Sequence, residues 1–116
     1  MNIIRPLLIL TLSLVSISLA RAHAFLDHAD PRVGSTVNPS PTQVELWMTE
    51  ELEPAFTKIK VLDSNGTEVD KKDAKISGST MIVSLPNLPS GVYKVAWKAV
   101  AVDTHVTTGD FTFTVN

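Results

Sequence analysis

Short runs in which apolar and polar residues alternate constrain the fold of this chain more than any other feature of its sequence. In one of them Val44, Leu46 and Met48 occupy every second position and would share one face of a strand. Runs that alternate in this way, or that are rich in β-branched and aromatic residues, occupy 43–48, 58–61, 81–85, 92–102 and 111–115. Turn-forming residues, such as those at 63–66, separate the runs. The pattern predicts an all-β sandwich or barrel.

The first 22 residues differ from the rest and are typical of an export signal. Arg5 precedes an apolar run over 7–19, and Ala20-Arg21-Ala22 is a small-x-small cleavage sequence. The alternative is a membrane anchor, but the apolar run is shorter than the roughly 20 residues that span a bilayer, and serines interrupt it. We therefore expect residues 1–22 to be a cleaved signal peptide and residues 23–116 to form one domain of 116 − 22 = 94 residues.

The composition of the remaining chain excludes several classes of protein. It contains no cysteine, which removes disulfides, thiolate catalysis, cysteine–zinc sites and blue-copper centres. Without Arg5 and Arg21 it has 8 Lys and Arg against 12 Asp and Glu, a net charge of 8 − 12 = −4. No basic patch is apparent along the sequence to suggest an anionic membrane surface as a partner, and we expect no nucleic-acid partner.

Histidine occupies the position where cleavage after Ala22 would start the mature chain. His23 would then carry a free amine and an imidazole on one residue, both able to bind one metal ion. Asp103 and His105 are two residues apart, so in an extended segment their side chains would lie on the same side. By itself this tripeptide is also consistent with a turn aspartate and a packed histidine. Together the three residues offer three nitrogens and one oxygen, a donor set suited to tetragonal Cu(II).

The affinity of such a site should depend on pH. The amine of His23 must lose its proton to bind a metal, and the ordinary pKa of that group is about 7.7–8.0. We therefore expect copper binding to weaken as the solution becomes acidic.

Three stretches of the sequence resemble the CopC family of bacterial periplasmic copper-resistance proteins: HAFLDHADPRVGSTV, VELWMTEELEPAF and GVYKVAWKAVAVDTHVTTGDFTFTV. The resemblance implies a cupredoxin-like, immunoglobulin-like Greek-key β-barrel and a periplasmic location. It also implies that His23, Asp103 and His105 bind one Cu(II) ion per chain. The implied partner is a CopD-type inner-membrane copper transporter, and we expect the protein to be a monomer.

The sequence departs from members of that family that have a second, methionine-rich site for Cu(I). Only Met48 and Met81 remain after cleavage, both on predicted apolar faces, so we expect no Cu(I) site. His28 and Glu50 are candidates to lie beside the copper ligands without binding the ion directly. The ordinary interpretations of these two residues are an exposed histidine and a solvated acidic loop.

Three functions are compatible with the sequence. The first is a copper carrier with no enzymatic activity. The second is a copper-dependent oxidase of the lytic polysaccharide monooxygenase type, which also binds copper through an N-terminal histidine. The third is a metal-free immunoglobulin-like interaction module. The carrier is favoured over the oxidase because Asp103 would occupy a position that an oxidase keeps open, and so short a chain has few loops for a polysaccharide-binding face.

A different cleavage position would change the metal site. A cut after Ala20 would leave Arg21-Ala22-His23 at the start of the chain. A histidine in third place forms a square-planar Cu(II) or Ni(II) site with the amine and two backbone amides, without Asp103 or His105. Cleavage after Ala22 is favoured, because the resemblance to the CopC family starts at His23.

Overall fold

The computed structural model describes residues 24–116, so the predicted signal peptide and His23 lie outside the described residues. Within this range the chain forms β-strands and no helix, and it therefore contains no helix that could cross a membrane. The strands are β1 (Leu26–Asp30), β2 (Thr36–Val37), β3 (Gln43–Met48), β4 (Lys58–Leu62), β5 (Lys75–Ser77), β6 (Thr80–Ser84), β7 (Gly91–Val100) and β8 (Val106–Val115). The predicted all-β class is confirmed.

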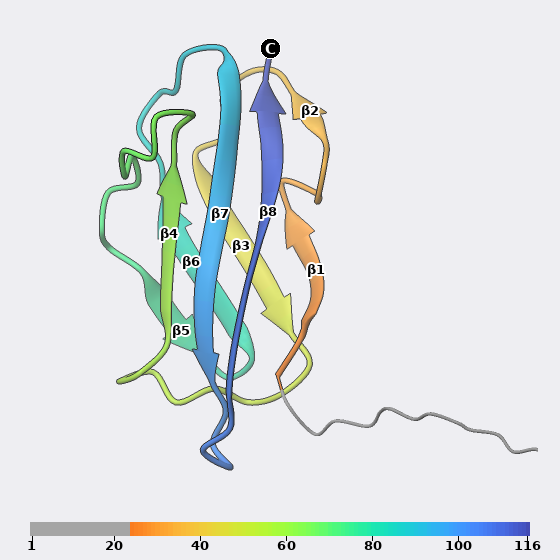
Figure 1. Ribbon diagram of the computed structural model, residues 1–116, viewed down its shortest axis with the longest axis vertical. Helices are drawn as coiled ribbons and strands as arrows, with labels where there is room; N and C mark the ends of the chain where they lie inside the picture. Colours follow the sequence, from red (N-terminus) through yellow and green to blue (C-terminus); the bar gives the residue numbers. More distant parts are fainter. Residues whose placement is uncertain (1–23) are drawn as a thin grey trace, which may run out of the picture.

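The eight strands form two four-stranded sheets that pack face to face (Figure 1). One sheet has the order β1-β3-β6-β5 and the other the order β2-β8-β7-β4. Neighbouring strands are antiparallel except for β2 and β8, which are parallel. Only the β5–β6 and β7–β8 connections stay within one sheet, whereas all others cross to the opposite sheet. These crossings give a Greek-key sandwich of the immunoglobulin-like kind.

Alternating residues of the strands fill the space between the two sheets, as the sequence pattern predicts. In β3 the side chains of Val44, Leu46 and Met48 are all buried. The other large buried side chains include Ile59, Val61, Met81, Val83, Leu85, Tyr93, Val95, Phe111, Phe113 and Val115. Burying these apolar surfaces is the main stabilising contribution in a domain without disulfides.

A buried tyrosine closes one end of this core. The Tyr93 hydroxyl donates a hydrogen bond to the carbonyl oxygen of Pro89 (2.6 Å), four residues earlier. Its ring stacks on Phe113 with 5.7 Å between ring centroids, and burial raises the pKa of the Tyr93 hydroxyl. A tyrosine that bonds back to the preceding turn is a recurrent feature of Greek-key sandwiches.

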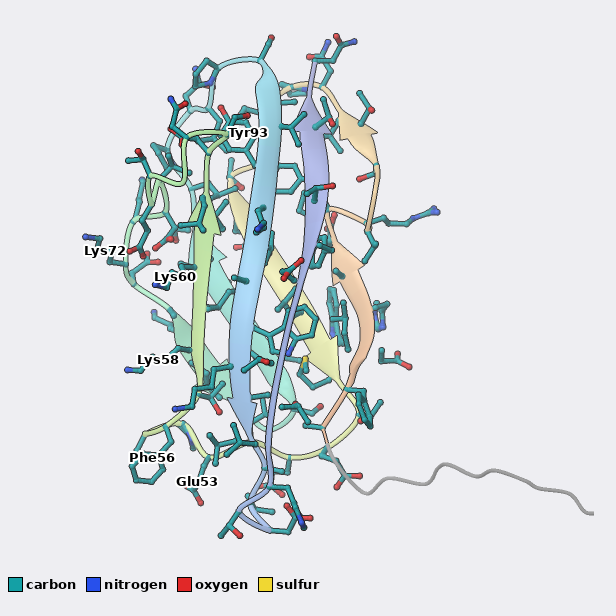
Figure 2. The ribbon with its side chains drawn as sticks, viewed as in Figure 1. Glu53, Phe56, Lys58, Lys60, Lys72 and Tyr93 are labelled. Carbon is teal, nitrogen blue, oxygen red and sulfur yellow. The ribbon has the colours of Figure 1, made fainter. Side chains whose placement is uncertain are left out.

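The last two strands differ from the sequence prediction in their bounds, and the difference positions the candidate site. β7 ends at Val100, two residues before the predicted end at 102, and β8 begins at Val106, well before the predicted run at 111–115. The two strands pair along their whole length. Residues 101–105 therefore form the loop of a long hairpin, at the end of the sandwich opposite Tyr93 (Figures 1 and 2).

Candidate metal site

The loop that joins β7 to β8 carries Asp103 and His105, and backbone hydrogen bonds fix its shape. The Ala101 amide donates to the His105 carbonyl (3.0 Å), and the Thr104 amide donates to the Ala101 carbonyl (2.8 Å). Thr104 has a φ of 77°, in the left-handed region that turns a chain sharply. The two candidate ligands are thus brought together by a tight turn, and the extended geometry predicted for this segment is wrong.

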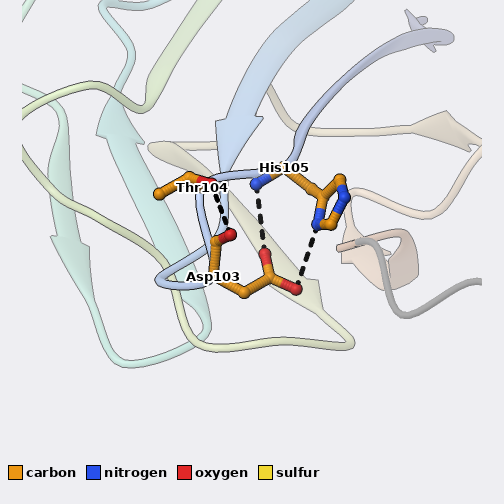
Figure 3. A network of polar contacts seen from close by, with 3 residues as sticks. All are labelled: Asp103, Thr104 and His105. Carbon is orange, nitrogen blue, oxygen red and sulfur yellow. Dashed lines mark hydrogen bonds and ion pairs between the residues drawn. The ribbon is translucent and has the colours of Figure 1, made fainter.

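Within this turn the Asp103 carboxylate contacts His105 twice (Figure 3). Asp103 Oδ1 accepts a hydrogen bond from the His105 amide (3.1 Å), and Oδ2 lies 3.2 Å from Nδ1 of the His105 ring. Two ligands at a right angle, each about 2.0–2.2 Å from one metal ion, lie about 3 Å apart. The oxygen and the ring nitrogen therefore already have a separation that suits one shared ion. Both side chains are accessible, with 42% of Asp103 and 57% of His105 exposed.

The beginning of the described chain is fixed beside this loop. The Thr107 hydroxyl, two residues after His105, donates a hydrogen bond to the carbonyl oxygen of Ala24 (2.5 Å). Ala24 is only 1% exposed. Phe25 extends the attachment, because its amide and carbonyl form hydrogen bonds of 2.8 Å with the side chain and the amide of Thr49. Figure 1 shows the start of β1 at the same end of the sandwich as the β7–β8 loop.

This attachment fixes the first described residue close to the loop. Thr107 and His105 are two residues apart and at most about 7 Å from each other, so Ala24 lies near the two candidate ligands. The hydrogen bond that joins Thr107 to Ala24 links residues 83 positions apart, and no pattern in the sequence pointed to it. Thr107 is the residue of this attachment that the sequence did not reveal.

The acidic segment that follows β3 runs along the base of the same loop. The Glu51 carbonyl accepts a hydrogen bond from the Val102 amide (3.1 Å), and the Glu53 amide donates to the Val100 carbonyl (2.7 Å). Between them Leu52 is buried and forms an isolated bridge with Ala101. Glu50, the predicted neighbour of the site, is half-buried at the start of this segment. The carboxylates of this segment therefore make the loop end of the domain more negative.

His28 lies on the outer face of the sheet β1-β3-β6-β5. A register shift between Leu26 and His28 breaks the alternation of β1 and turns the histidine outward. Its ring stacks on Trp47 with 4.3 Å between centroids and 7° between planes, and its Nδ1 lies 2.7 Å from Asp27 Oδ2. Trp47 is consequently a surface residue of this sheet. His28 and Asp27 form a second exposed histidine–carboxylate pair, separate in contacts from Asp103 and His105.

Within residues 24–116 no three histidine, aspartate or glutamate side chains converge in a way that could hold a metal ion. Asp103 and His105 supply two donors, fewer than the three or four protein ligands of a typical metal site. The two methionines of this range, Met48 and Met81, are buried in the core. Their thioethers are packed between the sheets and contribute to the hydrophobic interior.

Comparison with known proteins gives one consistent result. The sequence profile of the CopC domain matches residues 26–116. The chain is 37% identical over 98 residues to the copper transport protein CutJ of Bacillus subtilis. The matched region covers 81% of this chain but only 18% of that longer protein. It is 35% identical over 106 residues to copper resistance protein C of Escherichia coli, covering 83% of each chain. The crystal structure of CopC from Methylosinus trichosporium OB3b superposes with a TM-score of 0.76 at 33% identity, covering 81% of this chain and 94% of that one.

Proposed function

The chain belongs to the CopC family, whose named members are copper-resistance and copper-transport proteins, and we propose that it carries one Cu(II) ion in the periplasm. The proposed ligands are the amine and imidazole of His23, the carboxylate of Asp103 and the imidazole of His105, after removal of residues 1–22. The observation that carries this proposal is the hydrogen bond from Thr107 to Ala24, because it attaches the chain next to His23 beside the loop that holds the other two ligands.

The chemistry of the donor set favours Cu(II) over softer ions. Imidazole, amine and carboxylate suit a divalent ion in tetragonal coordination, whereas Cu(I) prefers thiolate and thioether ligands. The chain has no cysteine, and the side chains of Met48 and Met81 are buried in the core. We therefore propose no Cu(I) site. One negative carboxylate ligand and the nearby Glu51 and Glu53 offset part of the charge of the bound ion.

Exposure of the site suits a carrier that exchanges its ion with another protein. Asp103 and His105 lie on a loop at the tip of the domain, with much of each side chain accessible. A partner can approach there without unfolding the sandwich, and a CopD-type inner-membrane transporter is the proposed recipient. We propose no catalytic role. Sustained peroxide production with ascorbate and bound copper would contradict this and favour an oxidase.

Copper titration of two histidine variants tests the proposed ligands. His105→Asn removes one imidazole from the site, and His28→Asn removes an equally exposed histidine that also contacts a carboxylate. We expect His105→Asn to lower Cu(II) affinity by more than the roughly 10- to 100-fold typical of losing a group that only orients a ligand. His28→Asn should leave the affinity unchanged. Equal effects of the two substitutions would contradict the assignment of the site.

A further inference from the structure

Four lysines that are scattered in the sequence gather on the outer face of the sheet β2-β8-β7-β4. Lys58 and Lys60 lie on β4, and Lys94 and Lys98 lie on β7. All four are exposed and alternate with buried residues of the same strands, so they share the face that points away from the core. Figure 2 shows Lys58 and Lys60 along β4 at the margin of the sheet. We call these four residues the lysine face.

The strand register brings these positive charges together. Lys58 pairs directly with Lys98 and Lys60 pairs with Ala96, while Ala96 in turn pairs with Asp110 of β8. Asp110 is the only acidic residue in the four strands of this sheet. The lysine face with Asp110 therefore has a net charge of 4 − 1 = +3, on a domain whose net charge is 8 − 12 = −4. The rest of the domain carries −4 − 3 = −7.

Folding stability does not explain this arrangement. Two like charges directly opposite each other on neighbouring strands, as Lys58 and Lys98 are, destabilise a sheet. Lysines on an edge strand such as β4 can prevent aggregation, but β7 is an interior strand, and its lysines have no edge to protect. Among the described residues, no carboxylate lies within 4.0 Å of the ammonium group of any of the four. The four charges are therefore available to a partner.

The shape of the lysine face indicates which kind of partner. It is the surface of a β-sheet with a shallow hollow of about 240 Å³, lined by Lys58, Lys60, Ala96, Trp97 and Lys98. Protein–protein interfaces are depleted in lysine, so a partner other than a protein is favoured here. Anionic lipid surfaces attract clustered lysines through charge alone, and each lysine raises the binding affinity about fivefold. We propose that the lysine face docks on an anionic phospholipid surface.

Sedimentation with lipid vesicles tests this proposal. The exported, copper-free protein, with its N-terminus defined by mass spectrometry, is mixed with vesicles of phosphatidylcholine alone or of phosphatidylcholine and phosphatidylglycerol in equal parts. We expect binding only to the vesicles that contain phosphatidylglycerol, and weaker binding as salt is raised. Replacing Lys58, Lys60 and Lys98 by Gln should lower the affinity by about a hundredfold.

A control variant with the same net charge separates the lysine face from charge in general. Arg32, Lys71 and Lys75 are exposed and lie off this face, and replacing all three by Gln removes the same number of positive charges. This variant should keep most of the binding. The proposal is overturned if the protein does not bind the anionic vesicles, if the two triple variants bind equally, or if the lysine face binds polyglutamate but not vesicles. The last result would identify an acidic protein as the partner.

Discussion

The hydrogen bond between Thr107 and Ala24 is the contact on which the proposed site depends most, and it can be removed with one substitution. Thr107→Val keeps the branched shape of the side chain but removes the hydroxyl that donates to the Ala24 carbonyl. Ala24 is buried, so its carbonyl oxygen would be left without that donor at a cost of about 1–3 kcal/mol. The chain before β1 can avoid this cost by detaching from β8, which would move His23 away from Asp103 and His105.

Detachment would appear as weaker copper binding. If the whole loss of about 1–3 kcal/mol weakens the attachment of the chain start to β8, the apparent Cu(II) affinity falls by about 5- to 150-fold. Thr108→Val is the matched control, because Thr108 follows on the same strand but is exposed on the opposite face. Affinities are measured by competition with a chromophoric chelator, at a temperature where urea unfolding shows both variants to be fully folded. Equal affinities of the two variants would refute the role of this contact in organising the site.

Three further predictions concern the fold that holds the site. Gly109→Ala should lower the free energy of unfolding by about 1–3 kcal/mol in urea, because a Cβ at this position would lie 2.4 Å from the Trp97 ring; unchanged stability would contradict that packing. Asp70→Asn should lower the free energy of unfolding by about 1–3 kcal/mol, because the two carboxylate oxygens of this buried residue each accept a backbone hydrogen bond, from Val61 (2.8 Å) and Lys72 (2.9 Å), and an amide has an NH2 donor in place of one of these oxygens; an unaffected urea midpoint would argue against it. The pKa of Tyr93 is raised by burial, so its contribution to stability is fully present below pH 10.0, the ordinary pKa, and is lost as the pH rises through the higher folded-state pKa. Because Tyr93 is the only tyrosine, ultraviolet titration of the folded protein reports this pKa directly, and an unshifted value would contradict the burial argument.

Much of the fold could be predicted from the sequence because local alternation determines which side chains point inward. The buried sets in β3, β4, β6 and the end of β8 agree with the predicted faces. The short strands β2 and β5 were not predicted, since two or three residues are too few to show a period. The outward position of His28 was not predictable either, because it results from a register shift in the pairing of β1 with β3.

The site and the lysine face show a second limit of sequence analysis. Asp103 and His105 could be chosen from their spacing, although the tight turn at Thr104 brings them together by a different geometry from the one expected. Contacts between distant segments, such as Thr107 with Ala24, have no local signal. The same is true of the opposed Lys58 and Lys98, which is why no basic patch was expected from the linear sequence.

The most direct test of the central claim is the Cu(II) affinity of two proteins that differ only at the start of the chain. One begins at His23 with a free amine, and the other is the same protein with that amine acetylated. Acetylation is used because an added residue would bring its own amine and a backbone amide beside the histidine, and a histidine in third place would create its own square-planar site. The acetylated protein should bind copper at least about a hundredfold more weakly and show one fewer nitrogen ligand in its electron paramagnetic resonance spectrum, because its amine is blocked. Equal affinity and an unchanged spectrum would contradict the proposal that the newly exposed amine and imidazole of His23 hold the ion together with Asp103 and His105.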